Sequence, residues 1–178
     1  MARSRTPVLH TARAANSALI GAADARAHLL TPALLVELDV LDANHAAMQA
    51  RCGGVGIALR PPAKAHKCVA IARRQLAVGA GGLCVATPGE AEVFAEAGLP
   101  DLLHTSTFAP GPALERLADV AAGCRLTLVL DAPETARALA AAARTRNLVL
   151  PVLVDLDMGR HRSGVAGPEA VAQLAAVI

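Results

Sequence analysis

Aromatic residues are almost absent from this sequence of 178 residues, which has no Trp, no Tyr and only two Phe. Proteins that hold single-stranded nucleic acids usually stack the bases on aromatic side chains, so this class is disfavoured. The formal net charge is only +2 and the basic residues are spread along the chain, which also disfavours binding to a phosphate backbone. We therefore expect no nucleic-acid partner.

Long hydrophobic runs and paired cysteines are also lacking. The longest stretch without a charge, residues 75–89, has 15 residues and contains four Gly and one Pro, so it is too short and too interrupted to span a bilayer. The four cysteines form no CxxC pair, which indicates reduced thiols rather than a disulfide framework or a zinc site. The sequence therefore predicts a cytoplasmic protein without a membrane partner.

Lysine is scarce, since only two of the 17 basic residues are lysines. Both of them, Lys64 and Lys67, lie in one short segment. Arginine cannot replace lysine where the chemistry needs a neutral, nucleophilic amine, so we interpret the pair as chemically required. The alternative is a chance pair of solvated lysines at the start of a helix, where cations oppose the helix dipole.

Short apolar segments alternate with longer, Ala-rich segments of helical pattern. The predicted strands cover residues 33–38, 55–59, 82–86, 102–105, 126–130 and 149–155, and the predicted helices cover 39–51, 66–78, 88–97, 111–122, 132–146 and 167 onward. Thr87 followed by Pro88, with Glu90 three residues after the Thr, indicates a helix start. This alternation predicts an α/β fold with a parallel sheet, either an open doubly wound sheet or a (β/α)8 barrel.

The predicted domain organisation rests on the length of the chain and on where the alternation of strands and helices begins and ends. Residues 1–29 are interpreted as an N-terminal extension, with a transit peptide as the less favoured alternative. Residues 30–178 are predicted to form one incomplete barrel domain, because a complete barrel needs about 250 residues. The segment from 167 also ends without a helix-stop signal, so we expect the front part of a larger domain.

Polar residues follow the predicted strands, and the carboxyl ends of strands are where functional groups of such folds gather. They are Arg60, Lys64, His66, Lys67, Thr87, His104, Asp131, Asp155, Asp157, His161 and Arg162. Lys64 is predicted to be a nucleophilic amine, with Arg60 and Lys67 as nearby cations that favour its neutral form. Asp155 and Asp157 are interpreted as a pair that either holds a divalent metal or orients an arginine. The alternative is a purely structural, hydrogen-bonded loop in which Asp157 braces Arg162.

Two of these segments resemble a known family. Arg60–Cys68 resembles the RPHxKxHK signature of the D-threonine aldolase and D-serine dehydratase-like family, whose members are fold-type III, alanine-racemase-like enzymes that use pyridoxal phosphate. Asp155–Val165 is similar to its VDxDxGxxRxGV segment. Three further segments, Thr31–Val36, Ile71–Ala80 and Ala86–Glu92, resemble the family's DTPALV, IARRQLxAGA and ATxxEAE stretches in the same order.

The resemblance implies a partial (β/α)8 barrel of the alanine-racemase N-terminal type that begins near Val55, with five strands present and with the C-terminal strands and a separate β domain absent. Lys64 would carry pyridoxal phosphate as a Schiff base, and His66 would move protons or pack against the cofactor. Arg162 would contact the phenolic oxygen, with Arg60 and Asp157 as further cofactor-binding residues. No metal ligand is expected in this chain, because the family's divalent metal would be held by the absent domain.

The activity that the resemblance implies is cleavage of D-3-hydroxy amino acids, such as D-threonine to glycine and an aldehyde. The alternatives are a D-serine dehydratase-like enzyme, an amino-acid racemase, a non-enzymatic carrier of pyridoxal phosphate, and an inactive fragment. Pro62 stands where the family has a His and Leu30 where it has an Asp. We expect this chain alone to be inactive, and the resemblance implies a D-amino acid substrate and a homodimer.

Overall fold

The computed structural model describes residues 16–178, so residues 1–15 of the predicted N-terminal extension lie outside the described residues. The chain divides into two compact units, of which the first ends at Leu41 and the second spans Asp42–Ile178. In the first unit the short 3-10 helix η1 (Ala25–His28) precedes extended, exposed chain. Helix α2 (Leu38–Gly53) matches the helix predicted over 39–51.

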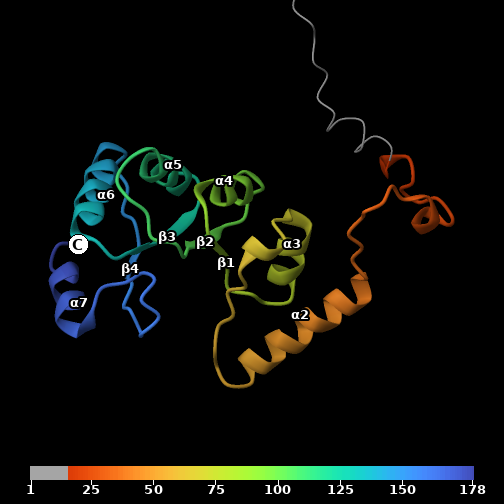
Figure 1. The fold of residues 1–178 in the computed structure, drawn as a ribbon, viewed down its shortest axis with the longest axis horizontal. Helices are drawn as coiled ribbons and strands as arrows, with labels where there is room; N and C mark the ends of the chain where they lie inside the picture. The colour runs from red at the N-terminus through yellow and green to blue at the C-terminus, as the bar shows by residue number, and fades with distance from the viewer. Residues whose placement is uncertain (1–15) are drawn as a thin grey trace, which may run out of the picture. The chain divides into compact units, whose positions relative to one another are not determined.

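The second unit is built on a four-stranded parallel sheet in the order β1-β2-β3-β4 (Figure 1). The strands are β1 (Leu83–Val85), β2 (Asp101–His104), β3 (Arg125–Leu130) and β4 (Val152–Val154). Each strand pairs with the next one along the sequence, and the order never reverses. A doubly wound sheet has a point where the order reverses, so the topology is that of a barrel wall.

Helices connect consecutive strands, as the alternating pattern predicts. They are α4 (Pro88–Glu96), α5 (Pro112–Ala121) and α6 (Pro133–Thr145). Before β1 come a 3-10 turn, η2 (Ala63–Ala65), and helix α3 (Val69–Ala77), and helix α7 (Gly167–Ala175) follows β4. Helix α4 begins as predicted, because the Thr87 hydroxyl accepts a hydrogen bond from the Glu90 backbone N–H at 3.2 Å. Helices α4, α5 and α6 lie along one side of the sheet (Figure 1).

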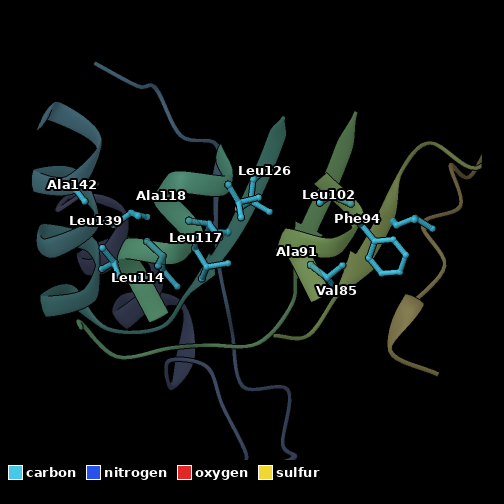
Figure 2. Packing of buried hydrophobic residues seen from close by; sticks show 14 of the residues in the cluster. Val85, Ala91, Phe94, Leu102, Leu114, Leu117, Ala118, Leu126, Leu139 and Ala142 are labelled. Atoms are coloured by element: carbon cyan, nitrogen blue, oxygen red, sulfur yellow. The ribbon is translucent and has the colours of Figure 1, made fainter. Parts of the chain in front are cut away.

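The hydrophobic core lies between the sheet and this helix layer. Alternate residues of β1, β2 and β3 are buried there, among them Leu102 of β2 and Leu126 and Leu128 of β3, with relative exposures of 0–1%. From the helices, Leu117 of α5 and Phe94 of α4 are equally buried (Figure 2). This period of two is what a strand with one fully covered face requires.

The other face of the sheet is only half covered by the described part of the chain. Cys84, Leu103 and Thr127 form one row across β1, β2 and β3, and all three are partly exposed. Leu153 of β4, paired with Val129, is 51% exposed. In a barrel this face is the interior, so these residues are apolar or small although no helix covers them here.

Two predicted strands are not formed. Residues 33–38 are exposed coil up to the start of α2, and no described strand lies beside them to form a ladder. Residues 55–59 form turns and coil, although the chain that follows runs beside β1: the N–H groups of Gly81 and Cys84 donate to the carbonyls of Leu59 and Pro61 at 2.9 and 3.0 Å. The described sheet therefore has four strands rather than the five expected for the barrel.

The core makes a first prediction. Replacing Leu128, which is fully buried on the central strand β3, by Ala removes its packing and leaves a cavity, so the free energy of unfolding should fall by about 2–5 kcal/mol. Far-ultraviolet circular dichroism in a urea titration measures this, since the chain has neither Trp nor Tyr for fluorescence. The matched control is Val149→Ala at a 99% exposed position, and equal losses in both variants would contradict the described core.

Candidate functional site

The turn that carries the two lysines lies just beyond the carboxyl end of β1. Pro62 forms a parallel bridge with Cys84, and the buried Ala63 then begins η2. The Ala63 carbonyl accepts the N–H groups of His66 and Lys67 at 3.2 and 2.8 Å, which closes the turn. Lys64 is exposed on this turn, and within residues 16–178 its amine has no ion pair and no hydrogen bond.

Lys67 is held in a different way. Its Nζ lies 3.0 Å from Oε1 of Glu90, whose side chain is only 7% exposed, while the side chain of Lys67 is 64% exposed. The backbone of Lys67 has φ 48°, in the left-handed region that residues with a Cβ rarely adopt. The two lysines of this turn are therefore in different chemical situations, one free and one in an ion pair.

Glu90 connects this turn to helix α4. Its Oε2 accepts the backbone N–H of Ala86 at 2.8 Å, while Oε1 faces Lys67. Burial by itself raises the pKa of Glu90, but the Ala86 N–H and the Lys67 ammonium outweigh it, so the pKa lies below its ordinary value. The sequence identified Glu90 only as a residue of the helix start.

The imidazole of His66 is turned into the protein and is not free beside Lys64. Its Nδ1 accepts the backbone N–H of Cys68 at 3.0 Å, which places the proton on Nε2, and Nε2 is buried without a hydrogen-bond partner. The ring packs edge-on against Phe94 at 6.5 Å, and burial lowers its pKa. These contacts favour a structural role for His66 in the turn over a proton shuttle.

Arg60 lies at the opposite end of the sheet. Its guanidinium forms two hydrogen bonds, at 2.9 and 2.7 Å, to the carboxylate of Asp101, the first residue of β2. Arg60 is bound at the start of β2, whereas Lys64 follows Pro62, which pairs with Cys84 of β1, and lies in the turn η2, so the two side chains belong to different edges of the sheet. The guanidinium of Arg60 is thus paired with Asp101, and its role as a cofactor-binding cation near Lys64 stays a prediction.

The loop after β4 is organised by Asp157. Its Oδ1 accepts the backbone N–H groups of Gly159, Arg160 and His161 at 2.9, 2.9 and 3.0 Å, and its Oδ2 lies 2.9 Å from Nδ1 of His161. These hydrogen bonds, led by the one from His161, lower the pKa of Asp157. The carboxylate therefore builds the loop and does not brace Arg162, which was the alternative considered from the sequence.

Arg162 itself is exposed and is free of ion pairs and side-chain hydrogen bonds to the described residues. The loop that presents it is tied to the sheet, since the Gly164 N–H donates to Oδ2 of Asp131 at 3.3 Å. Asp131 directly follows β3, so this contact lies at the same carboxyl edge as Lys64. Lys64 and Arg162 thus lie at the same edge of the sheet, Lys64 after the segment that runs beside β1 and Arg162 in the loop after β4.

His104, the last residue of β2, is on the helix side of the sheet. It is 1% exposed, its two ring nitrogens have no hydrogen-bond partner, and its ring packs edge-on against Phe108 at 5.7 Å. Burial lowers its pKa, although the Ser106 backbone and the Glu90 carboxylate act in the opposite direction. The imidazole is therefore neutral at pH 7 and lies on the helix-covered face of the sheet, at the end of β2.

The described residues contain neither a metal-binding cluster nor a membrane-spanning helix. No cluster of three or more His, Cys, Asp or Glu side chains between residues 16 and 178 is arranged to bind a metal ion. Of the helices described, none is long and apolar enough to cross a membrane.

A parallel sheet of sequential βα units, with an unpaired lysine and an unpaired arginine among the described residues at its carboxyl edge, defines a barrel-type α/β protein. Comparison with known proteins agrees with this class. The model of the alanine racemase N-terminal domain matches residues 36–178, and the chain belongs to that family.

The named relatives are lyases. D-threo-3-hydroxyaspartate dehydratase from Delftia sp. (strain HT23) is 38% identical over 145 residues, which are 82% of this chain and 38% of that protein. D-threonine aldolase from Arthrobacter sp. is 39% identical over 153 residues, covering 85% and 40%. The crystal structure of D-threonine aldolase from Filomicrobium marinum superposes with a TM-score of 0.83 at 35% identity, over 85% of this chain and 41% of that one.

These coverages confirm the partial barrel that the sequence predicted. The chain spans about 40% of the length of the curated relatives that it matches. The fold of the matched part is that of alanine-racemase-like proteins, and the parallel four-stranded sheet is one arc of their barrel.

Burial of His104 predicts how stability depends on pH. Its pKa is lower in the folded chain than in the unfolded one, so the unfolded chain binds more protons between the folded pKa and about 6.5. The free energy of unfolding should therefore fall as the pH drops from 7 to 5. Replacing His104 by Leu, which cannot titrate, should flatten this part of the profile, as measured by urea unfolding at each pH. Equally steep profiles in the two proteins would contradict the prediction.

Proposed function

We propose that this chain is the part of a lyase for D-3-hydroxy amino acids that carries pyridoxal phosphate, with D-threonine aldolase-like cleavage as the activity of the whole enzyme. The observation that carries the proposal is the free amine of Lys64 on a fixed turn at the carboxyl edge of a parallel sheet. The names of the relatives support the substrate class, since they include D-threonine aldolase and 3-hydroxy-D-aspartate aldolase.

The residues at this edge fit the group. Pyridoxal phosphate needs an amine that can react with its aldehyde, and Lys64 is the lysine of this chain that is not engaged by a carboxylate. Pyridoxal phosphate also carries a phenolic oxygen, and Arg162 is a suitable partner for that oxygen, because a guanidinium is always charged and donates hydrogen bonds in a fixed geometry. When bound, the cofactor would accept the electrons released as a bond to the substrate Cα breaks.

The other residues of the site prepare it. Asp157 fixes the loop that presents Arg162, and the contact between Gly164 and Asp131 attaches that loop to the end of β3. His66 ties the Lys64 turn to Cys68 and Phe94. We assign Lys64 as the catalytic residue, Arg162 as a cofactor contact, and His66 and Asp157 as positioning residues.

A dehydratase is the second candidate, because the relative from Delftia is as similar to this chain as the aldolase is. The two reactions begin on the same substrate class and differ in the bond that breaks at Cβ. The proposal also includes a D-amino acid substrate, a divalent metal bound outside this chain, a homodimer and a cytoplasmic location; all four cysteines are free, as a reducing compartment requires.

The central test concerns the attachment of the cofactor. The wild-type chain mixed with pyridoxal phosphate should develop a visible absorption band, and borohydride reduction with peptide mass mapping should find the cofactor on Lys64. Lys64→Arg keeps the charge but has no usable amine, so the band and the adduct should disappear. Lys67→Arg is the matched control and should keep both. A wild-type chain without an adduct on Lys64 would overturn the proposal.

Arg162 gives a second test on the same complex. Replacing it by Ala removes a charge-assisted hydrogen bond of about 1.5 kcal/mol or more, so binding of pyridoxal phosphate should weaken about tenfold. The matched control is Arg160→Ala, which removes an exposed arginine from the same loop and should change affinity little. A titration followed by absorbance measures both, and equal affinities for the two variants would remove Arg162 from the site.

A further inference from the structure

The two lysines of the chain lie three residues apart but differ in what surrounds them. Lys67 Nζ is 3.0 Å from Oε1 of Glu90, whereas the amine of Lys64 has no partner in the part of the chain that the structure describes. An amine bonds to an aldehyde carbon only as the neutral base, through its lone pair, and the aldehyde oxygen then leaves as water. An ammonium group held against a carboxylate keeps its proton, and so it is the poorer nucleophile.

The position of Glu90 does not depend on Lys67. Its side chain is 7% exposed, it belongs to helix α4, and its second carboxylate oxygen accepts the Ala86 N–H at 2.8 Å. The exposed Lys67 is therefore paired with a carboxylate that the Ala86 N–H also holds in place. The space around this contact is a cavity of about 240 Å³ at the start of α4, lined by Thr87, Gly89, Val93 and Phe94 together with the ion pair.

The backbone of Lys67 fits this picture. A left-handed conformation costs a residue with a Cβ about 1–2 kcal/mol, and Lys67, which is not a glycine, adopts it with φ 48°. In this conformation the Lys67 ammonium is paired with Glu90. This ion pair turns Lys67 toward α4 and leaves Lys64 alone on the other part of the turn.

We propose that Glu90 is the positioning residue that decides which lysine takes the cofactor: it holds Lys67 as an ammonium ion against helix α4, and Lys64 remains the reactive amine. This inference rests on the proposed function. It adds a residue that neither the lysine motif nor the helix-start pattern identifies as part of the site.

The first test needs no cofactor. The chain has two lysine side chains, so limiting acetic anhydride followed by peptide mass mapping gives one ratio of acetylation, Lys64 to Lys67. In the native wild type we expect a ratio of about 3 or more, which corresponds to the usual strength of a partly exposed ion pair. Glu90→Gln keeps an oxygen that can accept the Ala86 N–H but loses the charge, and the ratio should fall to about 1.

Two controls separate this effect from a general loosening of the fold. Glu92 lies on α4 like Glu90, but it is paired with Arg116 of α5 and not with Lys67. Glu92→Gln removes that ion pair and should keep the wild-type acetylation ratio. Glu90→Asp keeps the negative charge and should retain a ratio above that of Glu90→Gln. If Glu90→Gln does not fold by circular dichroism, the wild type decides, because its native ratio must exceed the ratio measured in urea.

The second readout is where the cofactor attaches. After treatment with pyridoxal phosphate and borohydride, the wild type should carry the label on Lys64, and Glu90→Gln should distribute it between Lys64 and Lys67. A native wild-type acetylation ratio near 1, or a folded Glu90→Gln variant with the wild-type ratio and the wild-type label, would overturn the role of Glu90. Absence of label on Lys64 in the wild type would instead overturn the proposed function, and the acetylation ratio would still report on Glu90.

Discussion

The buried carboxylate of Glu90 is the interaction on which the geometry of the lysine turn depends. A buried charge without partners costs several kcal/mol, and the buried carboxylate of Glu90 on helix α4 has two partners, one hydrogen bond and one ion pair. One partner, Ala86, belongs to the end of β1, and the other, Lys67, belongs to the turn that carries Lys64. The start of α4, the end of β1 and the reactive turn therefore form as one structural unit, and errors in any of them would displace the amine.

The parallel sheet divides the polar residues between two edges with different tasks. At the amino edge, Arg60 is bound in bidentate fashion by Asp101, close to Gly82, where an added Cβ would lie 2.8 Å from the Asp101 carbonyl oxygen. Both carboxylate oxygens of Asp101 accept a hydrogen bond from Arg60, and this contact ties the chain before β1 to the start of β2. At the carboxyl edge, Lys64 and Arg162 are left without partners among the described residues. The paired arginine thus lies at the amino edge and the two unpaired cations at the carboxyl edge, which is the edge where barrels place their active sites.

Local patterns predicted the local structure well and the long-range structure less well. The helices and the cap at Thr87 follow from signals within a few residues, and the structure has them at the expected places. The apolar segments 33–38 and 55–59 have strand composition, but a strand also needs a partner, and composition does not reveal whether one is present. Arg60 is near Lys64 in sequence, yet extended chain separates them. The ion pair between Lys67 and Glu90 joins residues 23 apart, and no pattern along the chain indicates it.

The concentration of both lysines in one turn gives this chain an unusual relation to proteases. An endoproteinase specific for lysine can cut only within this turn, and such enzymes need an extended substrate backbone. The native turn cannot supply one, because Lys67 is left-handed and the Ala63 carbonyl is bound by two N–H groups. Cleavage therefore requires local opening, and its rate reports the free energy of that opening separately from unfolding of the sheet. The rate of lysine-specific cleavage thus measures the local stability of the turn that holds Lys64 and Lys67.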